Sequence, residues 1–405
     1  MDSGHTAWLL MSSALVLFMT PGLAFFYGGM VRAKNVLAML MKNYVAMGVV
    51  TILWVLVGAS LTFSGSTTLG GYSVIGDFNL WGLRDLGLSN DHFGLPYPDN
   101  VHIMFQLTFA IITPALISGA IAERMKFTAW AVFIAIWSLL VYVPVAHWVW
   151  GGGFIGADIE ALDFAGGLVV HINAGAAALA LLMVLGPRIG FRRDIIRPHS
   201  LPLTVLGAGI LWFGWFGFNG GSAFAADAAA GNAFLTTQVA AATAATAWII
   251  AEGFIHGKPT TLGFVSGAVA GLVAITPAAG FVGPLGAMLI GLAAGLVCFW
   301  ALRLKIMFNF DDSLDVVAVH LVGGILGSLL LGVLAEEAYG GHSGSFELLG
   351  RQALSVVIAF AYSFGVTFVI AKVLDAVMGI RAAADDERSG LDLALHEEQS
   401  YVMAE

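Results

Sequence analysis

The chain has 405 residues, of which 59% are hydrophobic and only 11% are charged, and its formal net charge at pH 7 is −9. Soluble domains carry about 25% charged residues, so the composition argues against a soluble domain and indicates a chain that crosses a membrane several times. The net charge says little about nucleic acid, because most of the surface should face lipid, and we expect no nucleic-acid partner. The single cysteine, Cys298, excludes an intramolecular disulfide.

A transmembrane helix needs about 20 predominantly apolar residues. Stretches of this kind cover residues 7–31, 36–63, 101–122, 127–149, 164–186, 200–219, 233–252, 260–277, 281–302, 314–335 and 351–379. The sequence therefore predicts an all-α polytopic membrane protein with eleven transmembrane helices in residues 1–380, followed by a polar cytoplasmic tail at 381–405. The first stretch is as long as a spanning helix and lacks a preceding basic segment, so we expect no signal peptide.

Lysine and arginine residues gather on one side of the predicted membrane domain. The loops and tail on that side hold Arg32, Lys34, Arg124, Lys126, Arg188, Arg192, Arg193, Arg197, Lys258, Arg303, Lys305, Arg381 and Arg388. The other side holds only Arg84 and, at a helix start, Arg351. The positive-inside rule therefore predicts an external N-terminus and a cytoplasmic C-terminus in the cell (inner) membrane. The longest loop, about 64–100, is then external and is expected to fold over the outer mouth. Lys42 and Lys372 fall within spans near the inner end, where snorkelling explains them.

The chain repeats a pattern in which a histidine follows an acid. Asp163 lies eight residues before His171 in the fifth stretch. The same spacing separates Asp312 from His320 in the tenth. The first five helices thus match the next five, and because five is odd, the two halves should have opposite orientations, which is the inverted-repeat plan of many transporters. Each histidine then lies about 12 Å from its helix start, and the pseudo-twofold axis should bring the two together at the membrane centre. The eleventh helix stands outside the repeat.

Ionisable residues at mid-membrane depth are candidates for a functional site. A single buried histidine is more often a hydrogen-bonded packing residue, but His171 and His320 at symmetry-related positions favour a functional role. Two imidazoles can share one proton, and apolar burial disfavours their charged form, so the pair suits a small neutral or proton-carrying polar solute. Two histidines without a third ligand do not complete a metal site, and we expect neither a metal nor a cofactor.

The acids of the repeat have a structural interpretation as well. Asp163, Asp312 and Asp315 each stand where a helix begins, so capping of the first turn is the expected role of their side chains. A carboxylate near an outer vestibule also favours a cation electrostatically, and for Asp163 we keep both interpretations.

Aromatic residues gather at the outer ends of several predicted helices. Phe105 and Phe109 share one face of the third helix, Trp150 ends the fourth and Phe218 lies near the end of the sixth. Aromatic residues at membrane interfaces usually form anchoring belts. Because glycines nearby allow close backbone approach, we favour an aromatic cage that attracts a small cation through cation–π contacts, with the Ser222 hydroxyl as acceptor.

These segments resemble the ammonium transporter family, which comprises the Amt, Mep and Rhesus proteins, over nearly the whole chain. The motifs that carry the resemblance are Pro21-Gly22-Leu23-Ala24-Phe25-Phe26-Tyr27-Gly28-Gly29, Asp163 to His171, Gly214-Trp215-Phe216-Gly217-Phe218-Asn219 and Asp315-Val316-Val317-Ala318-Val319-His320. The resemblance implies a homotrimer of eleven-helix subunits with one pore each. It also implies ammonium as the substrate, with methylammonium as an analogue.

The resemblance further implies an external ammonium site made by Phe109, Trp150 and Ser222, with Asp163 as its structural and electrostatic partner. Trp150 and Ser222 resemble the Amt branch, because Rhesus proteins lack that aromatic–hydroxyl pair. One departure lies nearby: the loop between Trp150 and Asp163 is one residue longer than the commonest bacterial pattern.

Below that site, the resemblance implies that Phe109 and Phe218 stack as a gate and that His171 and His320 are twin pore histidines. Ammonium would be captured outside and deprotonated before or within the pore, and neutral ammonia would pass the histidines. The proton would either be released outside or be relayed separately through the two histidines, and the sequence leaves both routes open.

The tail from Gly390 to Tyr401 is similar to family tails that bind a PII-type regulatory protein. Glu397 departs from that pattern, because it stands where glycine is common. The resemblance therefore implies a PII-type partner at this tail, together with the lipid bilayer and the other subunits.

Three alternatives to a transporter stay open at this point. The first is an ammonium sensor, or transceptor, that signals through the tail, although about 25 residues leave no room for an output domain. The second is an intramembrane hydrolase, for which the sequence lacks both a metal motif such as H-E-x-x-H and an activated serine or aspartate pair. The third is a channel for another small neutral solute, such as carbon dioxide or water. We therefore predict a protein that is not an enzyme.

Overall fold

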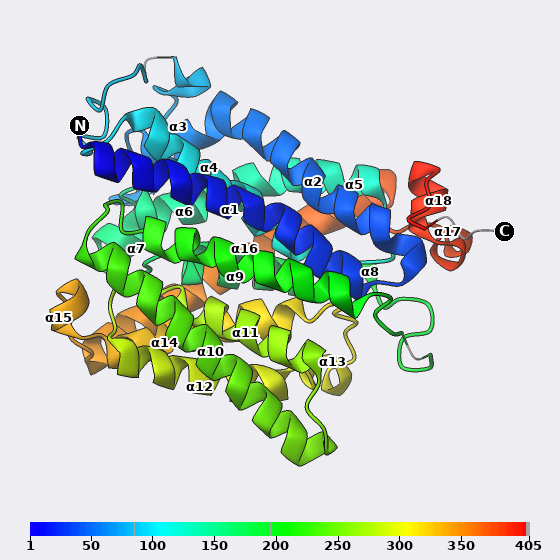
Figure 1. Cartoon of the computed structure of the whole chain (residues 1–405). Helices are drawn as coiled ribbons and strands as arrows, with labels where there is room; N and C mark the ends of the chain where they lie inside the picture. Colours follow the sequence, from blue (N-terminus) through cyan, green and yellow to red (C-terminus); the bar gives the residue numbers. More distant parts are fainter. Residues whose placement is uncertain (85, 195, 402–405) are drawn as a thin grey trace.

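The computed structural model describes residues 1–84, 86–194 and 196–401. Its helices run side by side along one direction, with the N-terminus at one end of the bundle, called the outer end below (Figure 1). The short helices α17 (Ala384–Ser389) and α18 (Leu391–His396) lie at the opposite, inner end. In the described part of the chain, ten helical segments are long and apolar enough to cross a membrane, and the shorter apolar helix α11 (Thr261–Ile275) occupies the place of the eighth predicted span. The predicted all-α polytopic architecture is confirmed, with the eighth span shorter than predicted.

Within its described residues, the first half of the chain forms eight α-helices of very different lengths, interrupted by short 3₁₀ and π segments and one hairpin. In chain order these are α1 (Ser3–Met30), η1 (Ala33–Asn35), α2 (Val36–Leu53), η2 (Trp54–Gly58), α3 (Ala59–Phe63), β1 (Thr67–Leu69), β2 (Tyr72–Ile75), η3 (Trp81–Leu83), α4 (Asp99–Ile117), α5 (Phe127–Trp137), η4 (Ser138–Tyr142), α6 (Val143–Trp150), α7 (Phe154–Ala157), η5 (Gly167–Ile172) and α8 (Asn173–Leu185). The second half contains α9 (Leu201–Gly221), α10 (Ala228–His256), α11, α12 (Pro284–Ala301), α13 (Leu304–Met307), η6 (Val317–Leu321), α14 (Val322–Leu334), α15 (Glu337–Gly340), α16 (Phe346–Met378), α17 and α18.

Polar side chains begin several of the spanning helices. In each case the side-chain oxygen accepts a hydrogen bond from the backbone N–H three residues further along, which satisfies one donor that the first helical turn cannot pair. These capping residues are Asp2, Ser200, Asp227, Thr260 and Ser345. Within lipid an unpaired backbone donor is costly, so such caps fix where the helices start.

The two halves of the chain meet where two short π-helical segments cross. η5 carries His171 and η6 carries His320, so each repeat has a π segment at the same place. Four residues after each histidine stands a glycine, and a Cβ atom on Gly175 would lie 2.6 Å from the Leu321 backbone, while one on Gly324 would lie 3.1 Å from His171 Cβ. These reciprocal close approaches keep the two helices near enough for their histidines to touch.

The loop after α3 folds back against the outer end of the bundle. Its strands β1 and β2 form an antiparallel hairpin, and His147 of α6 fastens it. His147 Nδ1 donates to the Thr62 carbonyl oxygen at 2.8 Å, so its Nε2 accepts from the Ser73 hydroxyl, also at 2.8 Å. Further along this loop, Phe93 packs against His102, with ring centroids 5.1 Å apart. The hairpin and Phe93 thus cover part of the outer end.

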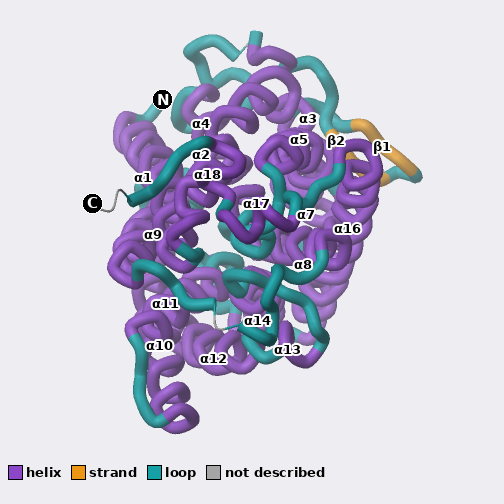
Figure 2. The backbone as a smooth tube through the Cα atoms, turned by 90° about the vertical axis from the view of Figure 1, so that its right-hand side faces the viewer, coloured by secondary structure: helices purple, strands orange, loops and turns teal. Residues whose placement is uncertain are grey.

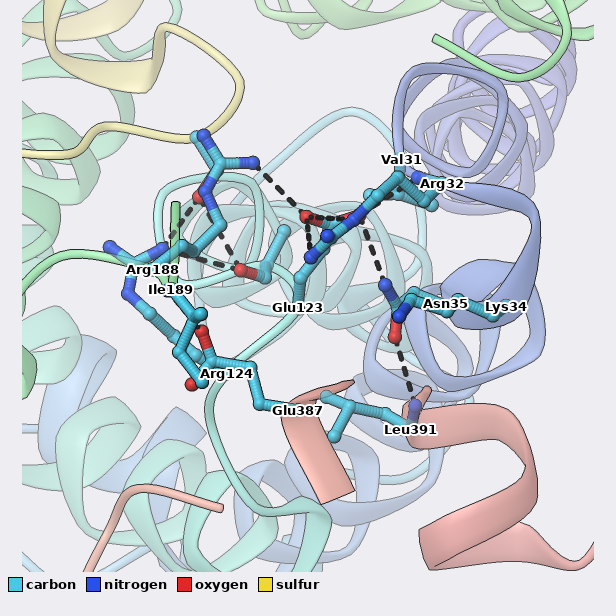
Figure 3. A network of polar contacts seen from close by, with 12 residues as sticks. Val31, Arg32, Lys34, Asn35, Glu123, Arg124, Arg188, Ile189, Glu387 and Leu391 are labelled. Carbon is cyan, nitrogen blue, oxygen red and sulfur yellow. Dashed lines mark hydrogen bonds and ion pairs between the residues drawn. The ribbon is translucent and has the colours of Figure 1, made fainter. Parts of the chain in front are cut away.

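A network of buried charges joins the loops at the inner end (Figure 3). We call Arg32, Glu123, Arg124, Arg188 and Asp311 the inner ion cluster. Glu123 accepts hydrogen bonds from Arg32 at 3.1 Å and from Arg188 at 3.2 Å. Asp311 accepts from the Arg188 guanidinium through both oxygens at 2.8 Å and lies 3.7 Å from the fully buried Arg124. The basic loop residues that indicated orientation in the sequence are therefore, in part, members of a buried network.

Both carboxylates of the inner ion cluster are held in their charged form. Burial alone would raise the pKa of Glu123, but Arg188 and Arg32 outweigh it and keep that pKa below its ordinary value of 4.5. Burial likewise opposes the charge on Asp311, and Arg188 and Arg124 still lower its pKa below 3.8. A carboxylate whose pKa is lower in the folded state than in the unfolded state stabilises the fold when it is charged. The contribution of Glu123 and Asp311 is therefore complete at a pH above their ordinary pKa values. It is lost as the pH falls through their lowered pKa values in the folded protein.

The tail is bound to the bundle and is not a free extension (Figure 2). The Asp392 carboxylate accepts hydrogen bonds from Leu37 N at 3.1 Å and Ala38 N at 2.8 Å, and so caps the first turn of α2. Glu387 accepts from Ile189 N at 2.6 Å. Glu397 ends α18 in a left-handed conformation, with φ at +56°. Glycine adopts that conformation with least strain, which explains why glycine suits this position in similar tails.

The structure corrects the expectation for one of the two lysines within spans. Lys42 was expected to snorkel, but it is only 1% exposed, because α5 and α18 pack against α2. Lys372 is exposed, and its ammonium lies 5.7 Å from the centre of the Phe368 ring. The two lysines therefore occupy different environments despite their similar depth.

We predict that Glu123→Gln lowers the stability of the fold at pH 7, because it removes the negative charge between Arg32 and Arg188. Removing one partner of a buried ion pair costs about 3–5 kcal/mol, which a melting temperature of the purified protein in detergent will register. Asp385→Asn, which removes the exposed partner of Arg388, is the matched control and should leave stability unchanged. Equal melting temperatures for Glu123→Gln and the original chain would contradict a stabilising role for the cluster.

Candidate functional site

A chamber of about 340 Å³ lies near the outer end of the bundle, and its wall is largely aromatic. Phe109 from α4 meets Trp150 from α6 edge to face, with ring centroids 5.8 Å apart. Ser222, directly after α9, and Asp163 line the same chamber. The four residues predicted for an outer site come from distant parts of the sequence, and the tertiary fold gathers them around one space, the outer chamber.

Local hydrogen bonds fix how these side chains present themselves. The Ser222 hydroxyl donates to the Phe218 carbonyl oxygen at 2.8 Å, which leaves the lone pairs of its own oxygen as acceptors. Trp150 Nε1 donates to the Asp163 carbonyl oxygen at 3.0 Å and so holds the indole plane. An aromatic wall and a hydroxyl acceptor therefore border the same small volume, which is an arrangement that suits a small hydrogen-bonding cation.

The Asp163 carboxylate is engaged by the backbone that follows it. Its Oδ1 accepts from Gly166 N at 2.8 Å and Gly167 N at 2.6 Å. Its Oδ2 accepts from Leu168 N at 2.7 Å and Val169 N at 3.2 Å. The side chain thus satisfies the free donors at the start of η5, as the capping interpretation predicts, and Asp163 also lines the outer chamber.

The second repeat uses its first aspartate in the same way. Asp312 Oδ2 accepts from Val317 N, five residues further on, at 2.7 Å, and Asp163 bonds at the same spacing in the first repeat. Asp315 behaves differently: its φ is +64° and its carboxylate pairs with Lys305 at 2.6 Å. The capping prediction is therefore wrong for Asp315, because the turn before η6 directs that side chain toward a lysine instead.

Two phenylalanine rings separate the outer chamber from the space below it. Phe109 and Phe218 have ring centroids 4.3 Å apart and planes inclined by 40°. Phe109 lines the outer chamber, and Phe218 lines a narrow lumen of about 10 Å³ on the other side. A water molecule needs about that volume, so the lumen is no wider than one small molecule. The contact between the two rings closes its outer end.

The two histidines of the repeat meet in this lumen. His171 Nδ1 lies 3.2 Å from His320 Nδ1, and the rings are nearly parallel, with centroids 5.3 Å apart. The nitrogens can share one proton, with one donating and the other accepting. Among the described residues, His171 Nε2 has no hydrogen-bond partner although it is buried. The pair therefore presents one imidazole nitrogen that a solute in the lumen can contact.

A second chamber of about 190 Å³ continues the path toward the inner end. It shares Phe26, Val269 and His320 with the lumen. Glu252 and Asp315 add carboxylates to its wall. The outer chamber, the ring contact, the lumen and this inner chamber form one route along the bundle, with its most apolar section in the middle.

Sequence reasoning did not assign a role to two residues along this route. Trp215 stacks on His171 with centroids 5.6 Å apart, and its Nε1 donates to the Thr276 hydroxyl at 2.9 Å. His102 lines the outer chamber beside Phe224. The available signals were weak: Trp215 lies within an aromatic motif that also fits a packing role, and His102 lies one helical turn before Phe105. No three His, Cys, Asp or Glu side chains gather as a metal site in the chain as far as it is described.

Comparison with known proteins gives the same family as the motifs. The model of the Ammonium Transporter Family matches residues 7–401. An ammonium transporter of Mycobacterium tuberculosis is 48% identical, covering 100% of this chain and 91% of its own. Ammonium transporter Amt1 of Archaeoglobus fulgidus is 45% identical, with 99% and 100% covered.

The chain belongs to the ammonium transporter family.

This ammonium transporter family member also shares its fold with solved structures. A structure described as a Sensor Amt Protein superposes with a TM-score of 0.90 at 30% identity, covering 97% of this chain and 98% of that one. Relatives at 45–48% identity are named as transporters, so the alternative of a sensor is not favoured. The chain is a multi-pass membrane protein of a transporter family.

We predict that Asp163→Ala destabilises this family member strongly, because four backbone N–H groups lose their acceptor. Each buried unsatisfied donor costs about 1–3 kcal/mol, so the loss of four acceptor contacts should cost at least about 4 kcal/mol. The yield of folded protein and its melting temperature in detergent measure the effect. Asp158→Ala, at an exposed position in the same loop, is the control. If the two variants were equally stable, the carboxylate would not be needed to start η5.

Proposed function

We propose that this chain captures ammonium in the outer chamber and passes it, as ammonia in the apolar section, through the lumen that His171 and His320 line. The observation that carries the proposal is the contact between the two imidazoles, with a free Nε2 on His171, at the narrowest part of a route between two chambers. Ammonium transport is also the activity after which the relatives are named.

The chemistry of the outer chamber supports ammonium as the ion that enters. Ammonium is a small cation with four N–H donors, so it can face aromatic rings through cation–π attraction and donate to a hydroxyl oxygen at the same time. Phe109 and Trp150 supply the rings and Ser222 supplies the oxygen. The Asp163 charge, held at the start of η5, makes the chamber more favourable for a cation than for an anion.

The lumen supports a neutral species beyond the ring contact. Its wall is apolar apart from the two imidazoles, and an unpaired ion in such surroundings is strongly disfavoured. Ammonia can accept or donate a hydrogen bond, and His171 Nε2 offers the matching partner. The proton that ammonium leaves behind is either released on the outer side or relayed by the histidine pair.

We predict that Trp150→Ala weakens capture of ammonium and raises the concentration for half-maximal transport. One cation–π partner is worth about 0.5–2 kcal/mol, so the increase should be at most roughly thirtyfold. Uptake of methylammonium and ammonium-driven current in liposomes measure it. Trp81→Ala is the control, because Trp81 lies in the outer loop, away from the chamber. An unchanged concentration dependence would remove Trp150 from the site.

We predict that His171→Leu and His320→Leu each reduce ammonium-driven current at least tenfold, because either change removes the shared proton and the polar contact in the lumen. His342→Leu, at an exposed position, is the matched control. Stopped-flow measurement of ammonia entry into the same liposomes separates two routes. A variant that loses current but still conducts ammonia supports a proton relay, whereas loss of both supports a direct contact with the solute. Normal transport by both variants would remove the pair from the pore.

We further propose that the N-terminus is external and the C-terminus cytoplasmic in the cell membrane. The asymmetry of lysine and arginine supports this orientation, because the loops of the inner ion cluster and the tail carry most of the cations. The test is a reporter protein that works only outside the cell, fused after Glu405. If this fusion is active, the C-terminus is external and the proposed orientation is reversed.

We also propose that three copies assemble, as the family resemblance implies, and that the tail binds a PII-type regulatory protein. The ordered position of α17 and α18 over the inner end supports a surface that a partner can reach. We expect a purified PII-type protein to bind the full chain and to lose binding when residues after Arg381 are removed. Glu397→Gly, which suits the local backbone, should retain binding. The native mass of the purified protein in detergent tests whether it is a trimer. If the PII-type protein still binds the truncated chain, the tail is not its docking site.

A further inference from the structure

The outer chamber is much larger than its proposed solute. Its volume is about 340 Å³, whereas a water molecule, which is close to ammonium in size, occupies about 30 Å³ in the liquid. Its aromatic wall suits larger cations as well, because aromatic cages also bind methylated ammonium ions. The lumen has a volume of only about 10 Å³, so a larger cation that entered the chamber would stay there and block the route. Selection by size therefore protects the route only if it acts at the entrance to the chamber.

Aromatic rings border the outer chamber on the side away from the lumen. α4 begins at the outer end, because the loop before it accepts a hydrogen bond from Asp2 N at the N-terminus. His102, in the first turn of α4, has the rings of Phe63 and Phe224 beside it, with centroids 5.4 Å and 5.3 Å away. Phe109 lies two turns deeper, which is about 10 Å along the helix. Phe63, His102 and Phe224 therefore mark the entrance of the chamber, and Phe109 marks its floor.

Phe224 is held in a backbone conformation that a bulky residue rarely adopts. Its φ is +56°, in the left-handed region that favours glycine and asparagine. Its ring meets Phe105 edge to face, with centroids 5.8 Å apart, and it is only partly buried. Packing alone therefore gives little reason for a strained aromatic residue here. Strain of this kind is found at ligand sites, where the surrounding structure imposes it.

The loop that carries Phe224 is fastened on both sides by α1. Before Phe224, the Gly220 carbonyl oxygen accepts a hydrogen bond from Trp8 Nε1 at 3.1 Å. After it, Ala226 N donates to His5 Nδ1 at 3.0 Å. These two contacts fix the ends of the loop against the outer turns of one helix. They therefore hold the strained residue, and with it the ring, at the entrance of the chamber.

We propose that Phe224 is a size filter at the entrance of the outer chamber and that it excludes alkylated ammonium ions which the lumen cannot pass. This inference rests on the proposed function, in which the chamber captures ammonium. Tetramethylammonium carries a methyl group in place of each N–H of ammonium, so it is wider and is attracted to aromatic rings. With the Phe224 ring in place the entrance admits ammonium, and the wider cation stays outside the aromatic wall.

The test measures binding of tetramethylammonium to the purified full chain in detergent by isothermal titration calorimetry. Phe224→Gly removes the ring and suits the left-handed backbone, so it should fold at least as well as the original chain, which its melting temperature checks. We expect Phe224→Gly to bind tetramethylammonium at least about tenfold more tightly, the effect of more than one cation–π contact. In liposomes, the concentration of tetramethylammonium that halves the ammonium-driven current should fall by the same factor. Phe224→Tyr keeps the ring and should retain the weak binding of the original chain.

Two further variants show where the probe binds. Leu83→Gly makes the same kind of change at another left-handed residue, outside the chamber, and should bind tetramethylammonium like the original chain. Trp150→Ala, added to Phe224→Gly, should abolish the gain in affinity, because the cation loses a wall of the chamber. If Phe224→Gly does not fold, Phe224→Asn replaces it, since asparagine also tolerates this conformation.

Equal affinity of Phe224→Gly and the original chain for tetramethylammonium would overturn the size filter. A gain in affinity that persists without Trp150 would overturn it as well, because the cation would then bind elsewhere. An original chain that carries no ammonium current would contradict the proposed function instead, and the calorimetry would still decide whether Phe224 excludes the larger cation.

Discussion

The close crossing of η5 and η6 is the contact on which the rest of the route depends. Gly175 and Gly324 allow the two segments to approach until the Nδ1 atoms of His171 and His320 lie 3.2 Å apart. Any larger side chain at either glycine would meet the opposite helix and separate the imidazoles. The lumen, the ring contact above it and the chamber below it are all arranged around this pair, because the helices that carry it also form their walls.

Buried polar groups hold the helix of His171 at both ends and the helix of His320 at its start. At their starts, Asp163 and Asp312 accept backbone N–H donors that would otherwise be unpaired in lipid, where such donors are costly. At the inner end, Arg188 follows α8 and pairs with Asp311, which precedes η6. One ion pair thus ties the helix of His171 to the helix of His320. Because the same cluster also contacts the loops that bind the tail, tail docking and pore geometry share one set of interactions.

Much of this arrangement could be derived from the sequence. Apolar length predicts the spans, because a helix must cross about 30 Å of hydrocarbon. The equal spacing from Asp163 to His171 and from Asp312 to His320, on helices an odd number apart, predicts that the repeat is inverted and that the histidines meet. Side-chain chemistry at the outer helix ends indicates a cation site. Each of these inferences rests on a local pattern with a fixed period or length, which a sequence displays directly.

Other features depend on which surfaces the helices bury against each other, and a linear pattern does not contain that information. Arg124 and Arg188 appear in the sequence as loop cations, and only packing turns them into partners of Glu123 and Asp311. The sequence predicts that Lys42 snorkels to the membrane surface, but α5 and α18 pack against α2 and bury it. The π segments at the histidines and the lysine partner of Asp315 have no sequence signal either, and the second of these follows from the turn before η6. Sequence alone thus predicted the spans and several of the residues that line the route, whereas tertiary packing decided the distances between those residues and the partners that each one contacts.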